Sequence, residues 1–171
     1  MVNAPAVPPA GVGELVEHLF SGSALCAVDA GGNILLPGFV RETIARRSDI
    51  RAMLVGAHEC DPCLTAYDRA YARILHADSE RRRIAEEGSA PAASHSRLRR
   101  IFGFAEDVAF GESGAIVLPP MMRRRARIGA QALIVGAGGT FEIWDPETAL
   151  AHRDPEIREI AAFHLDVQHA A

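Results

Sequence analysis

The sequence contains no lysine, since all 18 of its basic residues are arginine. We attribute this first to a GC-rich coding bias and second to selection for bidentate phosphate contacts, which arginine makes and lysine does not. With 22 acidic residues the formal net charge is −4, so the chain as a whole does not attract nucleic acid. Any DNA binding must come from a local basic patch, or from patches summed over an oligomer.

Cysteine is scarce, with three in 171 residues. An odd, low number argues against a disulfide framework and favours a reducing compartment, so we expect a cytoplasmic protein. Long hydrophobic runs are absent too. None approaches the roughly 20 residues of a membrane span, and the first residues lack the basic and apolar regions of a signal peptide. We therefore expect a soluble, unexported protein with no membrane partner.

What is present suits one ordinary domain or two small units that share a core, because 49% of the residues are hydrophobic. Residues 1–13 are rich in Ala, Pro and Gly without any period, which predicts a disordered tail. A short helix or turn at 15–20 leads to a predicted strand at 23–28. A glycine-containing turn at 29–33 and a second strand at 34–36 complete a predicted hairpin.

The next predicted elements are a short helix, two paired strands and a long helix. The helix at 39–47 has Val40 and Ile44 on one face and Arg41, Glu42, Arg46 and Arg47 largely on the other. The strands lie at 52–56 and 63–67, and the long helix at 68–87. Pro91 and several serines and alanines predict a linker at 88–96.

This order of elements recurs along the chain. Residues 28–37 align with 110–119, so that Pro119 matches Pro37, and each copy runs into an arginine-bearing segment. Further on, 53–57 match 133–137, and 64–68 match 142–145. Internal repetition of this length indicates one small unit used twice, each copy burying the other's apolar face. The alternative is two unrelated hairpins within one α+β domain.

A family resemblance rests on both repeats and on the end of the second. The first repeat contributes 19–22, 27–29, Gly32, Ile34, Leu36, Pro37 and Arg41. The second contributes 97–100, Gly103, Ala105, Val108, Gly114 and 116–120. The most distinctive stretch is Val-Gly-Ala-Gly-Gly-Thr-Phe-Glu-Ile-Trp-Asp at 135–145. On these residues the sequence from about 20 to 150 resembles the MraZ family, regulators associated with the bacterial division and cell-wall gene cluster.

The resemblance implies an α+β, mainly β fold: a pseudo-symmetric, swapped-hairpin, AbrB-like barrel of two tandem repeats, with helices after each repeat. Repeat 1 would cover 23–70, a helical or linker segment 71–103, repeat 2 104–147, and a C-terminal helix and tail 148–171. It further implies a nucleoid-associated homo-oligomeric ring that binds direct repeats in double-stranded DNA upstream of its own operon and represses transcription.

The family also carries an Asp-x-x-x-Arg signature at each hairpin turn, whose arginines are thought to face DNA. Here the first turn keeps Asp29 but has Asn33 in place of arginine, and the second has Gly111 and Ala115. The role of those arginines therefore does not carry over. Two hypotheses follow: a DNA-binding regulator, or an oligomeric scaffold or interaction protein of the same fold that has lost direct DNA binding.

Two arginine clusters could contact phosphates in place of the signature. One is 123–125 with Arg127, and the other is Arg97, Arg99 and Arg100. Alternatively they form solvated helix faces balanced by Glu106, Asp107 and Glu112. Asn33 could bond to a phosphate or base edge, or serve only the turn. The candidate DNA-binding residues are Asp29, Asn33, Arg41, Arg123, Arg124, Arg125 and Arg127.

The remaining motifs do not indicate catalysis. Cys60 and Cys63 lie near His58, but zinc needs a second ligand pair, and a redox motif needs a strand-to-helix junction, whereas this pair lies in a predicted hairpin loop. A metal-responsive or redox switch is the weakest hypothesis. Residues 136–139 predict a hairpin turn and not a phosphate loop, since no helix follows. We expect no enzyme, no metal or other cofactor and no small-molecule substrate.

Two aromatic residues complete the candidates. We expect Phe141 and Trp144 to pack between the repeats, and the alternative is a platform on which single-stranded bases stack.

Overall fold

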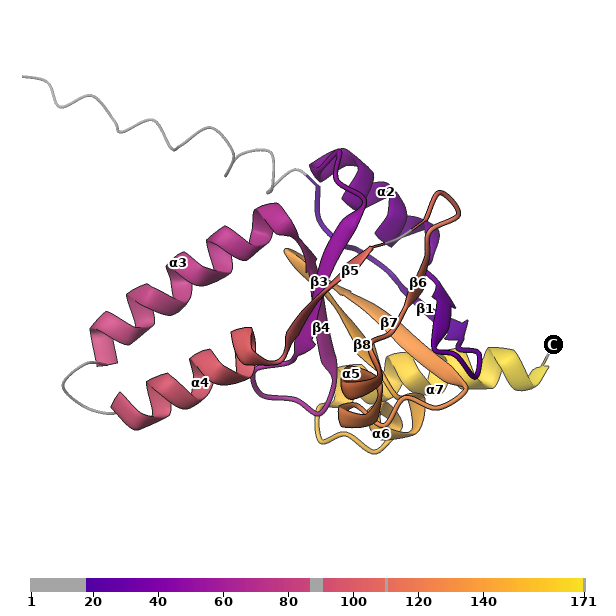
Figure 1. Ribbon diagram of the computed structural model, residues 1–171. Coiled ribbons are helices and arrows are strands. Elements are labelled where there is room, and N and C mark those ends of the chain that lie inside the picture. The colour runs from indigo at the N-terminus through magenta and orange to yellow at the C-terminus, as the bar shows by residue number, and fades with distance from the viewer. Residues whose placement is uncertain (1–17, 87–90, 110, 171) are drawn as a thin grey trace, which may run out of the picture.

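The computed structural model describes residues 18–86, 91–109 and 111–170 (Figure 1). The tail predicted at 1–13 lies outside the described residues, as do 15–17 of the predicted helix or turn. Phe20, at the end of that segment, is not helical. It forms an antiparallel bridge with Gly138, so the chain enters the fold as extended backbone.

The two repeats have the same order of elements. The first comprises β1 (Ser23–Ala27), β2 (Asn33–Leu35), α2 (Gly38–Arg47), β3 (Ala52–Ala57) and β4 (Leu64–Asp68). The second comprises β5 (Ala105–Ala109), β6 (Ala115–Val117), α5 (Pro120–Arg125), β7 (Gln131–Ala137) and β8 (Thr140–Trp144). The first strands, second strands and following helices of the two repeats all start at one constant spacing, the spacing that separates Pro37 from Pro119. The repetition seen in the sequence is thus also present in the secondary structure.

The strands form a six-stranded sheet of order β1-β7-β8-β4-β3-β5 and a two-stranded sheet of β2 and β6. All the strand pairs are antiparallel. The first strand of each repeat pairs with the other repeat, since β1 pairs with β7 and β5 with β3. If each strand is replaced by its equivalent in the other repeat, the same order is obtained, read from the opposite edge of the sheet. The two repeats are therefore related by a pseudo-two-fold axis.

The predicted hairpin of 23–28 with 34–36 is wrong in its pairing. Only one bridge, Val28 to Ile34, joins the two segments. The second segment reaches Pro37 after three strand residues, and proline has no N–H to continue a ladder. β1 therefore completes its hydrogen bonds on β7, whereas β2 pairs with β6.

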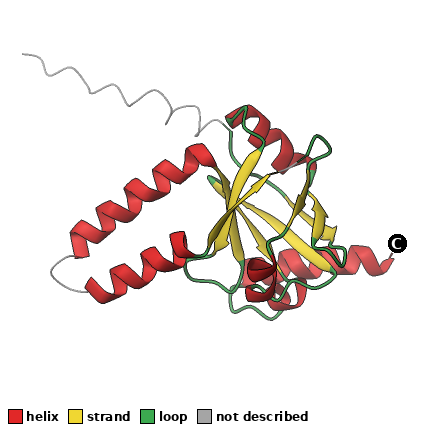
Figure 2. Ribbon diagram, viewed as in Figure 1, coloured by secondary structure: helices red, strands yellow, loops and turns green. Residues whose placement is uncertain are grey.

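The core lies between the sheets and beneath the short helices. It includes Ile34 and Ile116 from the two-stranded sheet, Val40 and Ile44 from α2, and Phe141 from β8, all nearly inaccessible to solvent. Phe20 packs against Phe141 with ring centroids 5.0 Å apart, which supports the expectation that Phe141 lies between segments of both repeats. The prediction of an α+β fold centred on β strands is confirmed, as Figure 2 shows.

Two further helix pairs flank this centre. α3 (Arg69–Glu86) and α4 (Pro91–Gly103) form an antiparallel hairpin that extends away from the sheet (Figure 1). The linker predicted at 88–96 is wrong from residue 91 onward, because Pro91 begins α4, and the first turn of a helix tolerates proline. Residues 87–90 lie outside the described residues.

At the other end α6 (Pro146–Leu150) and α7 (Pro155–Ala170) cover a second apolar cluster. Trp144 belongs to this cluster, which joins Leu25 and Cys63 of the first repeat to Leu133 of the second, so Trp144 packs between the repeats as predicted and also contacts the C-terminal segment through His152. Its place follows from strand alternation, which turns Trp144 away from the side of Phe141 that meets the main core. No helix among the described residues is long and apolar enough to cross a membrane.

Candidate nucleic-acid interface

The two-stranded sheet, here called the ribbon, lies at the centre of the candidate interface. Ile34 pairs directly with Ile116, its equivalent in the second repeat, so the pseudo-two-fold axis passes through this pair. Both isoleucines point into the core, and their neighbours therefore point outward. The outer face of the ribbon consists of Asn33, Leu35, Ala115 and Val117, all exposed.

Each strand of the ribbon follows a tight turn, turn 1 at 29–33 and turn 2 at 111–115. The two turns have the same backbone hydrogen bonds. Gly32 N–H donates to Asp29 O at 3.0 Å, and Gly114 N–H donates to Gly111 O at 2.9 Å. Gly32 and Gly114 both have positive φ, 87° and 82°, which glycine adopts without strain.

Turn 1 is closed by its own side chains. The Asn33 amide donates to both carboxylate oxygens of Asp29, at 3.0 and 2.8 Å, and the Asn33 backbone N–H donates to the same carboxylate at 2.8 Å. Bonds from the Asn33 backbone and side chain hold the pKa of the Asp29 carboxyl below its ordinary value. Turn chemistry, one of the two roles predicted for Asn33, is thus what its contacts in the structure support.

Two arginines brace the turns from the opposite repeat. Arg123 on α5 donates to Ala30 O in turn 1 at 3.0 Å, and Arg41 on α2 donates to Ser113 O in turn 2 at 3.4 Å. These arginines occupy equivalent positions in the two repeats. Arg123 also donates to the carbonyls of Ile128 and Gly129, at 3.1 and 3.0 Å. Both were predicted to contact DNA, and the structure places them against backbone.

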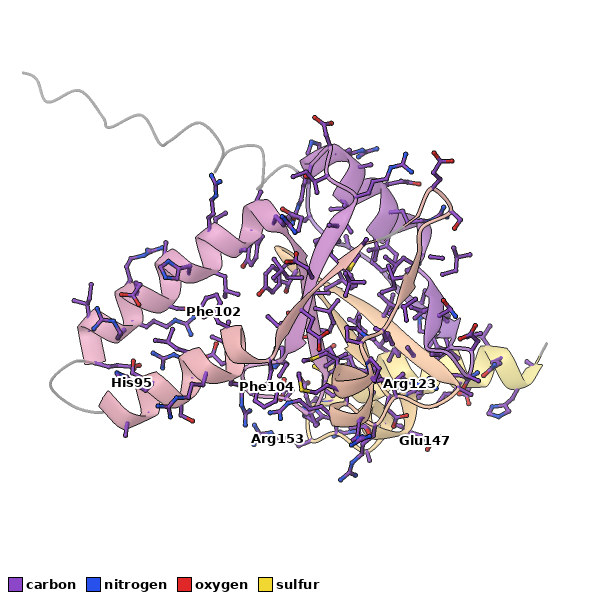
Figure 3. The ribbon with its side chains drawn as sticks, in the orientation of Figure 1. His95, Phe102, Phe104, Arg123, Glu147 and Arg153 are labelled. Carbon is purple, nitrogen blue, oxygen red and sulfur yellow. The ribbon has the colours of Figure 1, made fainter. Side chains whose placement is uncertain are left out.

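The rest of the basic run lies on α5 and just after it, where Arg127 lines a pocket with Asp145 and Glu147. Arg124, Arg125 and Arg127 are exposed, and the guanidinium of Arg125 lies 4.2 Å from the ring centroid of Phe104. Arg127 has a φ of 58°, which is uncommon for a side chain of this size. Figure 3 shows Arg123 and Phe104 on this side of the molecule, and His95 and Phe102 on the distant hairpin of α3 and α4.

In the other predicted cluster, Arg97 and Arg100 are bonded within the protein, whereas Arg99 is exposed. Arg97 pairs with Glu86 at 2.8 Å, and Arg100 donates to Glu59 O at 3.0 Å. The acidic residues that balance this cluster are therefore Glu86 and Glu59, and not those proposed from the sequence. Arg97 joins α3 to α4, so it serves the helical hairpin.

A residue that the sequence reading missed is Arg47, assigned there to the polar face of its helix. Its side chain is fully buried and pairs with the equally buried Asp68 at 2.9 Å. Arg47 also donates to His18 O at 2.6 Å and Gly139 O at 2.9 Å. It lies 4.5 Å from the ring centroid of Phe20, and so ties α2 to the β7–β8 turn of the other repeat.

Cys60 and Cys63 lie in the loop between β3 and β4, as predicted. Cys60 is exposed and Cys63 buried, and burial raises the pKa of the Cys63 thiol. His58 accepts hydrogen bonds from the backbone N–H groups of Cys60 and Asp61, at 3.3 and 2.9 Å. Among the described residues no group of three or more His, Cys, Asp or Glu side chains could hold a metal ion.

The chain matches curated relatives over most of its length, although no family model matches it. The transcriptional regulator MraZ of Saccharophagus degradans is 31% identical over 134 residues, 78% of this chain and 86% of the relative. The chain belongs to the MraZ family. MraZ regulators of Bordetella pertussis and Pseudomonas aeruginosa are 29% and 26% identical over 138 residues, covering 81% and 80% of this chain and 89% and 87% of their own lengths.

Two positions that the family resemblance assigns to the Asp-x-x-x-Arg signature lie on the outer face of the ribbon. Asn33 and Ala115 stand where the signature arginines would. Because the ribbon is antiparallel, these positions lie at opposite ends of that face, opposite Val117 and Leu35. Neither Asn33 nor Ala115 carries a charge at these two ends.

Proposed function

We propose that the protein is a cytoplasmic, nucleoid-associated transcriptional regulator that binds double-stranded DNA. The single observation that carries this is the family relationship, because the relatives are named transcriptional regulators. None of these names is that of an enzyme, in line with the prediction that this chain is not one. The interface we propose comprises the two turns, the outer face of the ribbon and the exposed arginines on and just after α5.

Within this interface, Arg124, Arg125 and Arg127 supply contacts to the phosphate backbone. All three are exposed, and each phosphate contact releases counterions. Arg41 and Arg123 hold the turns at a fixed position instead. Asp29 and Asn33 close the base of turn 1, where their mutual hydrogen bonds keep the turn rigid.

We further propose that the chain assembles into a closed homo-oligomeric ring that binds direct repeats upstream of its own operon and represses the division and cell-wall cluster. β1 and β5 are the edges of the six-stranded sheet, and exposed edges favour assembly. Summing weak contacts around a ring offsets the loss of the signature arginines. Light scattering tests the assembly, and a monomer at micromolar concentration would exclude the ring.

The second candidate is a scaffold of the same fold that has lost direct DNA binding. The observation that favours it is the absence of arginine at positions 33 and 115. A mobility shift with the DNA upstream of the operon separates the two. A regulator retards this fragment at moderate salt, whereas a scaffold does not.

The decisive experiment measures binding to that fragment over a salt series. Arg124→Ala with Arg127→Asn should reduce the slope of log affinity against log salt by about 1.8, since each phosphate contact accounts for about 0.9. Asparagine at 127 tolerates the positive φ found there. The matched control, Arg73→Ala with Arg99→Ala, removes two exposed arginines from the α3–α4 hairpin and should leave the slope unchanged.

Restoring the signature tests the turns themselves. Asn33→Arg with Ala115→Arg should bind more tightly, with a slope about 1.8 steeper, because two new cations would neutralise phosphates or read guanine. Unchanged affinity and slope would mean that the turns do not face DNA, and the scaffold would then be the better account.

A further inference from the structure

The outer face of the ribbon carries two large exposed apolar side chains and no charged one. Leu35 is 55% exposed and Val117 is 51% exposed, and they are equivalent residues of the two repeats. Large apolar side chains that remain exposed side by side indicate a contact surface. Nothing inside the described chain covers them, since the ribbon packs on the core only through Ile34 and Ile116.

The shape of the ribbon fits the major groove of DNA. Its strands are three residues long, about 10 Å at roughly 3.3 Å per residue. The major groove is about 12 Å wide and admits a two-stranded ribbon. The base edges exposed there include the methyl group of thymine, which makes contact with apolar side chains.

The charges around the ribbon fit the same occupant. At the turn-1 end lies α5 with the exposed Arg124, and at the turn-2 end lies α2 with the exposed Arg41 and Arg46. An apolar strip with cations at both ends matches a groove whose floor is bases and whose edges are phosphates. Acidic residues lie in the same region, Asp29 and Glu112 in the turns and Asp49 beside Arg41, and they reduce that charge in part.

Few groups on this face are available to recognise base edges by hydrogen bonds. The Asn33 amide donates to both oxygens of Asp29, so it does not also offer the paired contact that asparagine makes to adenine. Ala115 carries no polar group. The apolar side chains are what remains to distinguish one base pair from another.

We propose that the outer face of the ribbon reads the methyl groups of thymine in the major groove, through Leu35 and Val117. The protein then selects A·T base pairs at the steps beneath the ribbon. This inference rests on the proposed function, since it concerns the same interface. It assigns the sequence preference to apolar contacts that occupy the face between the two signature positions.

The test compares one upstream fragment amplified with dTTP and the same fragment amplified with dUTP, which differ only in the thymine methyl groups. Removing one buried methyl group should weaken binding about fourfold, so removing two should weaken it about fifteenfold. Leu35→Ala with Val117→Ala should bind the two fragments equally. Its salt slope should match that of the wild-type protein, because no phosphate contact changes.

A matched control is Ile84→Ala, which truncates an apolar side chain that is 60% exposed on α3. It should keep the full difference between the two fragments. Equal binding of both fragments by the wild-type protein would overturn the thymine proposal while leaving the proposed function intact. Absence of binding to either fragment would overturn both.

Two other results would also contradict the inference. If the double variant keeps the preference for thymine, other residues read the methyl groups. If it instead loses self-association in light scattering while its DNA affinity and preference stay unchanged, the outer face of the ribbon is a contact between copies of the chain.

Discussion

The buried pair of Arg47 and Asp68 leads to the sharpest prediction on stability. Neither side chain is exposed, and the guanidinium also donates to the backbone of the β7–β8 turn and of His18. Removing one partner of a buried, hydrogen-bonded ion pair costs about 3–5 kcal/mol, because the other charge stays buried without compensation. Arg47→Met should therefore lower the free energy of unfolding by about that amount.

Asp68→Asn should be costly for the same reason, although asparagine can still accept the N–H bonds of Ala70 and Tyr71 that cap α3. In the combined variant no isolated charge remains. Its cost should therefore be smaller than the sum of the two single costs by about 1–3 kcal/mol, the coupling typical of residues in direct contact.

Urea denaturation followed by circular dichroism measures all three free energies. Arg46→Ala is the matched control, since Arg46 is the exposed neighbour on the same helix and its loss should change stability by less than about 0.5 kcal/mol. The reasoning fails if Arg47→Met costs less than about 1 kcal/mol, or if the double variant loses the full sum of the single effects.

Three other predictions concern single positions. Gly114→Ala should destabilise by about 1–3 kcal/mol in thermal unfolding, because φ is positive there, whereas Gly111→Ala in the same turn has open space and should be nearly neutral. Asn33→Ala should raise the pKa of Asp29, as measured by NMR titration, because it removes the amide bonds to the carboxylate. In the natural protein these bonds stabilise the fold fully above the ordinary pKa of aspartate, and this stabilisation is lost as the pH falls through the lowered pKa of Asp29. Cys63 should resist alkylation at pH 8 until the protein unfolds, and modification of the folded protein would refute its burial.

Periodicity and turn residues sufficed to predict much of the fold. The helix at α2, the strands β3 and β4 and the turn at 136–139 lie close to their predicted positions. Local sequence did not reveal which strands pair, because β1 and β7 lie far apart along the chain and any apolar strand could complete either edge. Only the internal repeat indicated that the two halves of the chain exchange their first strands.

The candidate site was predicted less well than the fold. Arg124 and Arg127 are exposed, in agreement with their prediction as DNA-binding residues. Arg41 and Arg123 were predicted on the same grounds, as arginines near the turns, but their side chains bond to backbone carbonyls. The sequence alone does not distinguish an arginine that contacts phosphate from one that donates a hydrogen bond to a backbone carbonyl. The equivalence of positions 41 and 123 is the signal that could have separated them, since both repeats keep an arginine at the same place beside a turn.

The exchange of first strands between repeats has a consequence for how the protein is made. When β1 leaves the ribosome, its partner β7 has not yet been synthesised, so the emerging N-terminal half holds an unsatisfied strand until residue 137 is out. During that interval the β1 of one nascent chain can pair with the β7 of another on the same message. A shorter time between the release of β1 and that of β7 leaves less opportunity for such pairing between chains.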